Sequence, residues 1–206
     1  MNEYNKLMIT SADVFVLIKS INEKGWEGIK ESSINRIIYL SSVLYAFMFE
    51  DRDNPFHENY TFSITLSGPE DSSVEQSLIN LSANDAISLT ENGYVISNHN
   101  YISTFENLPN FIIKKAWLED ITYIIGLYGE GKIYDFVFRD PQYQNSIKTN
   151  SITPLNIGSD NATVEFLKKF KYEFEKNVRP EQKLTNRKYL RLYFEYVFGK
   201  ILRGDQ

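Results

Sequence analysis

The amino-acid sequence predicts an α+β fold that contains more helix than sheet. Apolar residues recur every three or four positions along several segments, which is typical of amphipathic helices. By contrast, residues 60–68 alternate between apolar and polar side chains, and residues 86–97 carry a hairpin turn signal. The chain has 206 residues, of which 42% are hydrophobic, so it is long and apolar enough to bury a core.

Two helices are expected within the first 50 residues. The first begins near Ser11, and Gly25 stands where it should end. The second begins at Ser32 or Ser33 and continues to about Phe47. The buried faces are expected to consist of apolar residues at helical spacing, namely Val14, Leu17, Ile18 and Ile21, then Ile34, Ile37, Ile38, Val43 and Leu44.

A strand, a short helix and a hairpin follow. The strand covers residues 60–68 and buries Tyr60, Phe62, Ile64 and Leu66. After the Gly68-Pro69 break, residues 70–81 form a short helix, and residues 86–97 form a hairpin that turns at Asn92-Gly93. Helix, helix, strand, helix and hairpin is the order of a winged-helix-like unit.

The rest of the chain divides into a helix, a strand, a connector and two more helices. A helix runs from Pro109 to about Ile125, a strand covers residues 132–138, and residues 139–161 form a polar connector with two prolines. Asp160 caps the next helix, RPEQ ends it, and a final helix runs from about Thr185 to Leu202. We therefore predict a winged-helix-like α+β domain over residues 1–150, followed by a C-terminal helical hairpin over residues 151–206.

Composition restricts location and chemistry. The chain has no cysteine, which excludes disulfides, thiolate nucleophiles and Cys-ligated zinc and favours a reducing cytoplasm. The apolar run at residues 14–18 is far shorter than the roughly 20 residues that span a bilayer, so no membrane contact is expected.

Charge is unevenly distributed along the chain. Residues 1–162 carry 11 Lys and Arg against 21 Asp and Glu, a formal charge of -10, whereas residues 163–206 carry 11 against 6, a charge of +5. This distribution has three interpretations. The basic C-terminal segment could contact the acidic body of the same chain, bind an acidic partner, or be a solvated helical face.

The stretch GLYGEGKI places Gly126, Gly131 and Lys132 at the spacing of a phosphate-binding loop. Such a loop follows a strand, opens a helix and has Ser or Thr after the lysine, whereas Ile133 follows here. The predicted order is also reversed, because this stretch leaves a helix and enters the strand at residues 132–138. We interpret it as a helix end and a glycine turn, with no nucleotide site.

Few residues offer catalytic or metal-binding chemistry. His57 lies in the acidic stretch DRDNPFHEN, but the spacing matches no metal motif, and His99 lies at the end of the hairpin. Asp135 and Asp140 lie beside the predicted strand without the lysine partner that a nuclease site needs, so both are interpreted as structural. The sequence predicts no catalytic residue, no metal site and no cofactor.

A winged-helix unit raises the question of DNA binding. The helix that would enter the major groove carries Glu70, Asp71 and Glu75 and no Lys or Arg, and Glu91 lies at the hairpin tip. Phosphates would repel these carboxylates, so protein contact is the favoured use of this unit.

The last helix is the strongest candidate for a partner-binding surface. Lys183, Arg187 and Arg191 recur every four residues, and Phe194 and Phe198 lie beside them. The cations would meet an acidic protein groove or DNA phosphates, and the phenylalanines would supply apolar anchors. The alternative is that both phenylalanines pack on the preceding helix.

Three stretches, SADVFVLIKSI, FSITLSGPEDSSVEQSLINLSANDAISLTENGYVISN and FVFRDPQYQ, carry a family resemblance. They resemble the small middle component of bacterial ABC-three-component systems, of the kind found in Lamassu antiphage defence. The resemblance covers about residues 8–145 and consists of an opening helix, a Gly-Pro break before a Leu-rich helix, a Gly-turned wing and a D-P-x-Y segment.

The resemblance implies a non-enzymatic adaptor subunit that links an SMC-like ATPase to a nuclease effector and meets DNA through the complex. Two alternatives remain open. One is a winged-helix DNA-binding regulator that contacts DNA through its basic C-terminal helices, and the other is a metal-dependent nuclease of unrecognised type.

Overall fold

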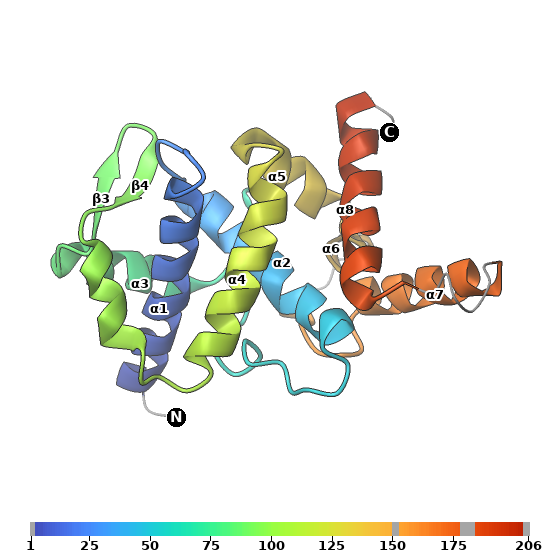
Figure 1. The fold of residues 1–206 in the computed structure, drawn as a ribbon, viewed down its shortest axis with the longest axis horizontal. Coiled ribbons are helices and arrows are strands. Elements are labelled where there is room, and N and C mark those ends of the chain that lie inside the picture. Colours follow the sequence, from blue (N-terminus) through green and yellow to red (C-terminus); the bar gives the residue numbers. More distant parts are fainter. Residues whose placement is uncertain (1–2, 150–152, 178–183, 204–206) are drawn as a thin grey trace.

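The computed structural model describes residues 3–149, 153–177 and 184–203 (Figure 1). Helices account for 64% of the structure and two small antiparallel sheets supply the strands, which confirms the α+β class. The elements, in chain order, are α1 (Glu3–Asn22), α2 (Glu31–Met48), β1 (Ser63–Thr65), β2 (Gly68–Glu70), α3 (Ser72–Ala83), β3 (Ile87–Thr90), β4 (Gly93–Ile96), the 3-10 helix η1 (His99–Phe105), α4 (Phe111–Gly126), α5 (Glu130–Phe138), α6 (Pro141–Lys148), α7 (Ala162–Lys176) and α8 (Asn186–Arg203).

Helices α1 and α2 form the centre of the molecule. Helix α1 packs against α3, α4 and β4, whereas α2 contacts α4, α5 and α7. Residues 9–18 of α1 are all buried, as are residues 37–47 of α2, because neighbours cover both helices on several sides. Helix α1 begins at Glu3 rather than near Ser11. None of the helices in the described ranges combines the length and the apolarity that a bilayer crossing needs.

The strand predicted over residues 60–68 is wrong for most of its length. Ser63–Thr65 forms β1, and the chain then reverses at Leu66-Ser67 so that β1 pairs antiparallel with β2, which begins at Gly68. Gly68 permits this turn because its φ of 115° is open to glycine but strained for other residues. The buried positions Tyr60 and Phe62 precede the strand, whereas Leu66 at the turn is fully exposed.

The predicted hairpin is present as β3 and β4. Thr90 pairs with Gly93, so the turn residues are Glu91 and Asn92, one position earlier than predicted. Gly93 has a φ of 113°, and a Cβ at this position would lie 2.4 Å from the carbonyl oxygen of Ile29. This close approach lets the segment before α2 form an isolated bridge between Ile29 and Tyr94.

Two predictions between residues 130 and 160 are wrong. The strand predicted at residues 132–138 is helix α5, because Ile133, Phe136 and Val137 are buried at helical spacing. The predicted connector contains helix α6, which begins after Asp140 with Pro141 in its first turn. Asp140 before a proline is therefore a helix start rather than a simple turn.

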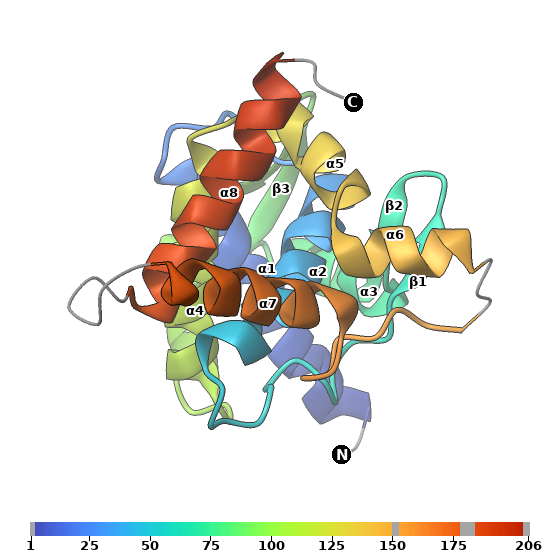
Figure 2. The ribbon, with the colours of Figure 1, turned by 90° about the vertical axis from the view of Figure 1, so that its right-hand side faces the viewer.

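Two C-terminal helices are present as predicted, although the first is capped by Asn161 rather than Asp160. Figure 2 shows α8 running across α7 rather than alongside it. Helix α7 packs on α2 and α6, and α8 packs on α5 and α2. One cluster of buried side chains extends from α1 to α8, so both predicted parts share a core, and the division at residue 150 stays a prediction.

Candidate functional site

Helix α8 presents the cationic side chains that the sequence singled out. The side chains of Arg187 and Arg191 are 66% and 75% exposed. Lys188 is also exposed, and we call these three residues the α8 basic edge. Lys183, the other predicted cation, lies outside the described residues.

The prediction that Phe194 and Phe198 are apolar anchors for a partner is wrong, because both side chains are buried. Both have a relative exposure of 0%, and both pack on Phe136 of α5, with ring centroids 4.7 and 4.8 Å away. Phe198 also stacks on Tyr128 at 3.8 Å. These rings therefore hold α8 on the body through α5, not through the preceding helix.

Part of the basic segment contacts the acidic body. Arg187 pairs with Asp120 of α4 at 2.5 Å, and Lys171 of α7 pairs with Glu50 at 3.6 Å. Both pairs lie at the surface, where such contacts contribute about 0–1 kcal/mol because water screens them. The internal contact suggested by the charge distribution is therefore present.

Helix α4 exposes an apolar row next to this edge, which we call the α4 stripe. Ile112, Tyr123 and Leu127 are 76%, 63% and 71% exposed, and Ala116 between them is also exposed. At 100° per residue these four positions lie within an arc of about 60° on the helix. Asp120, which pairs with Arg187, lies on the side of the stripe that faces α8.

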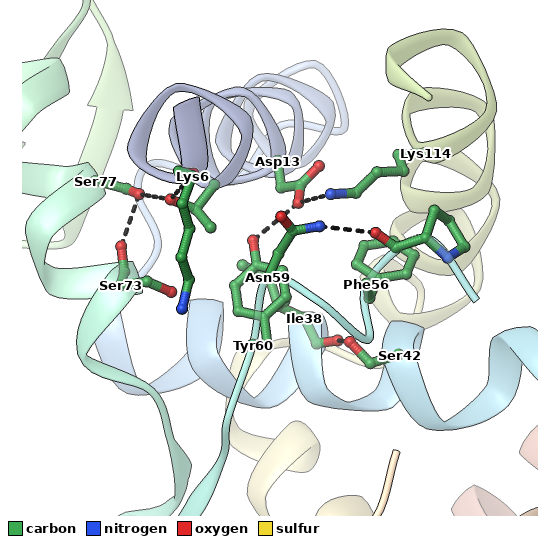
Figure 3. Close-up of polar contacts among 12 residues, drawn as sticks. Lys6, Asp13, Ile38, Ser42, Phe56, Asn59, Tyr60, Ser73, Ser77 and Lys114 are labelled. Atoms are coloured by element: carbon green, nitrogen blue, oxygen red, sulfur yellow. Dashed lines mark hydrogen bonds and ion pairs between the residues drawn. The ribbon is translucent and has the colours of Figure 1, made fainter. Parts of the chain in front are cut away.

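A buried ion pair joins α1 to α4 (Figure 3). The Lys114 ammonium contacts the Asp13 carboxylate, and their side chains are only 2% and 4% exposed. The Tyr60 hydroxyl donates to Asp13 Oδ2 at 2.9 Å, and Lys114 Nζ lies 4.7 Å from the Phe56 ring centroid. Asn59 lies beside this group in Figure 3, and its buried Oδ1 has no hydrogen-bond partner among the described residues.

Burial and charge attraction oppose each other in this pair. Burial raises the pKa of Asp13 and lowers the pKa of Lys114, and the attraction between the two groups reduces both shifts. Sequence reasoning missed the pair because Lys114 occurs within a run of two lysines that resembles a solvated helical face. A helical wheel would have placed Lys114 on the buried side, next to Trp117 and Leu118.

Asp140 is a second buried carboxylate, and it connects three helices. Its Oδ1 accepts hydrogen bonds from the Tyr39 hydroxyl of α2 at 2.8 Å and from the Tyr143 amide at 3.0 Å. Its Oδ2 accepts from the Thr163 hydroxyl of α7 at 2.6 Å. Burial raises the pKa of Asp140, although these hydrogen bonds oppose the shift. Asp140 has a relative exposure of 0%, and its hydrogen bonds connect α2, α6 and α7.

The GLYGEGKI stretch connects two helices. Gly126 is the last residue of α4, and Gly129 precedes α5 with a φ of 83°. The prediction that it enters a strand is wrong, because it opens a nine-residue helix. A helix rather than a strand precedes it, so its context still differs from that of a phosphate-binding loop, and Lys132 lies 3.9 Å from Asp135.

The acidic loop that contains His57 borders an open cleft of about 1290 Å³ between α2, the start of α4 and residues 158–160. Its ionisable lining residues are Glu50, Arg52, Asp53, His57, Glu58 and Asp160. Within the described ranges, no group of three or more His, Asp or Glu residues has a geometry suited to a metal ion.

Helix α3 is acidic where a DNA-reading helix would be basic. Asp71 caps it by accepting from the Ser73 amide at 2.8 Å, and Glu75 lies exposed in its first turn. Glu91 lies at the exposed tip of the β3-β4 hairpin.

No protein-family model matches this chain, and comparisons with curated proteins and with solved structures found none that is significantly similar.

Proposed function

We propose that this chain is a non-catalytic adaptor subunit of a bacterial antiviral defence complex, in which it links an SMC-like ATPase to a nuclease effector. The family resemblance over about residues 8–145 suggests the class of complex. The observation that carries a contact role is the combined surface of the α4 stripe and the α8 basic edge, which offers exposed apolar and cationic side chains together. Aromatic, aliphatic and arginine side chains are the groups that dominate protein interfaces.

We also propose that α1, α2, α3 and the β3-β4 hairpin form a winged-helix-like unit. In this arrangement the unit contacts protein rather than DNA. The exposed carboxylates of Glu75 and Glu91 support that preference, because they lie on the helix and hairpin that would approach phosphates.

The test is co-expression with the products of the neighbouring genes, among which the proposal predicts an SMC-like ATPase and a nuclease, followed by affinity capture and gel filtration. The adaptor function predicts one complex in which this chain contacts both proteins. A chain that elutes alone in the presence of both proteins would show that the proposal is wrong. Charge reversal at Arg187 and Arg191 should weaken the complex, whereas reversal at Lys132, on a different helix, should not.

The exposed cations of α8 also favour one second candidate, a DNA-binding regulator. It predicts that the isolated chain binds duplex DNA, that the affinity falls steeply with salt, and that reversal of Arg187 and Arg191 abolishes binding. Fluorescence anisotropy with a duplex at several salt concentrations separates the two functions, because the adaptor does not require such binding.

A further inference from the structure

The α4 stripe differs from the usual solvent face of a surface helix. That face normally carries charged or polar side chains, whereas here Ile112, Tyr123 and Leu127 are each more than 60% exposed. Single exposed apolar residues are common, but a row along one helix indicates a contact surface. Their exposure also means that no described part of this chain covers them.

The spacing of the row fits a partner of a particular shape. Successive members are separated by 4, 7 and 4 residues, from Ile112 to Leu127. At 1.5 Å per residue the row is about 22 Å long, and this spacing forms a straight seam. Another α-helix packs along such a seam with its own apolar residues at intervals of three and four, as in helix-in-groove recognition.

The two sides of the stripe differ in charge. Arg187 borders it on the α8 side through its pair with Asp120 of α4, and the loop residue Tyr128, just after α4, stacks on Phe198 of α8. Arg191 lies one turn further along α8, where it pairs with Glu195 at 2.9 Å. Within α8 the exposed or half-exposed charges are five cations and one carboxylate: Arg187, Lys188, Arg191, Lys200, Arg203 and Glu195. On the opposite side, Lys115 lies 3.9 Å from Glu119. The α8 side is therefore the one that attracts acidic groups.

We propose that the α4 stripe and the α8 basic edge bind one amphipathic α-helix of a partner protein, with the apolar face of that helix on the stripe and an acidic flank beside Arg187 and Arg191. The proposal rests on the adaptor function and specifies the chemistry of the contact. Nucleic acid would contact the cations of α8 but would leave the apolar row of α4 without a partner. A second copy of this chain packed antiparallel on the stripe would bring the two basic edges together.

The direct test uses a fluorescent synthetic peptide of about 20 residues that forms an amphipathic helix with leucines on one face and glutamates on one flank. A matched peptide carries lysines on that flank. The purified full chain should bind the glutamate peptide more tightly than the lysine peptide. Leu127→Glu should weaken binding at least about tenfold, the loss typical of a central contact residue.

Two variants act as controls. Leu89→Glu changes a residue that is 67% exposed on β3, far from α4 in Figure 1, and should leave the affinity unchanged. Arg191→Glu should reduce or reverse the preference between the peptides. Equal binding by wild type and Leu127→Glu would overturn the proposal, as would a wild-type dimer that Leu127→Glu converts to a monomer.

The same variants in the co-expressed complex separate this proposal from the adaptor function. A complex that assembles and keeps its affinity with Leu127→Glu overturns the docking surface and leaves the adaptor function intact. If the chain binds the glutamate peptide but neither the ATPase nor the nuclease, the docking surface is supported and the adaptor function is overturned.

Discussion

Replacement of Lys114 by methionine should be one of the most destabilising single changes in this protein. Methionine keeps most of the side-chain volume but leaves the Asp13 carboxylate buried, with the Tyr60 hydroxyl as its remaining charge-stabilising neighbour. Loss of one partner of a buried ion pair costs about 3–5 kcal/mol. A domain has only about 5–15 kcal/mol of stability, so a large fraction would be lost.

Urea unfolding monitored by tryptophan fluorescence is the appropriate assay. Trp117 is 2% exposed, and its indole Nε1 donates to the Ser41 carbonyl at 2.8 Å, so its emission reports on packing between α4 and α2. Lys115→Met is the matched control on the adjacent residue. Because Lys115 is partly exposed and lies 3.9 Å from Glu119, its loss should change the free energy of unfolding by less than about 0.5 kcal/mol.

A double-mutant cycle tests the physical cause. Adding Asp13→Asn to Lys114→Met removes the buried charge, so the double variant should be more stable than Lys114→Met alone. Equal unfolding midpoints for Lys114→Met and Lys115→Met would show that the buried ion pair does not contribute as predicted. The same conclusion would follow if the losses of unfolding free energy in the two single variants simply added in the double variant.

Four further predictions concern individual residues. Burial raises the native pKa of Asp140. The stability of the wild type relative to Asp140→Asn should therefore fall as pH rises above about 4, by up to about 1.4 kcal/mol per pH unit until the native pKa is passed. A stability difference between the two proteins that stays constant in denaturant titrations from pH 4 to 7 would contradict this. Phe198→Ala should destabilise the isolated chain by about 3–5 kcal/mol in urea unfolding because its ring is buried, whereas a surface anchor would leave stability unchanged. Gly93→Ala should lower the melting temperature, because its Cβ would lie 2.4 Å from a backbone oxygen, whereas Gly131→Ala has open space and should not. Lys132→Ala should leave the ATPase rate of the assembled complex unchanged, since this chain is not expected to bind ATP, and nucleotide binding by the isolated chain in calorimetry would contradict that expectation.

The parts of the fold that follow from local spacing were predictable. Long helices such as α2 and α4 have apolar periodicity over more than four turns, and the β3-β4 hairpin has a glycine that permits its turn. Helix α5 was not predictable in the same way, because its nine residues include a short apolar run that fits a strand or a helix. Its packing against α8 and α2 decides between them.

The binding surface was only partly predictable, because burial depends on tertiary contacts. Arg187 and Arg191 are exposed as expected. Phe194 and Phe198 are buried because both rings pack on Phe136 of α5, which is a helix rather than the predicted strand. The α4 stripe was not predicted, because the exposed side of this helix is defined only by the elements that pack against its other sides.

We would co-express this chain with the SMC-like ATPase and the nuclease that the proposed adaptor function requires, and measure the mass of the purified particle by light scattering. The adaptor function predicts a single species that contains all three proteins, and omission of this chain should separate the nuclease from the ATPase. The adaptor function is wrong if the ATPase and nuclease form the same particle without this chain.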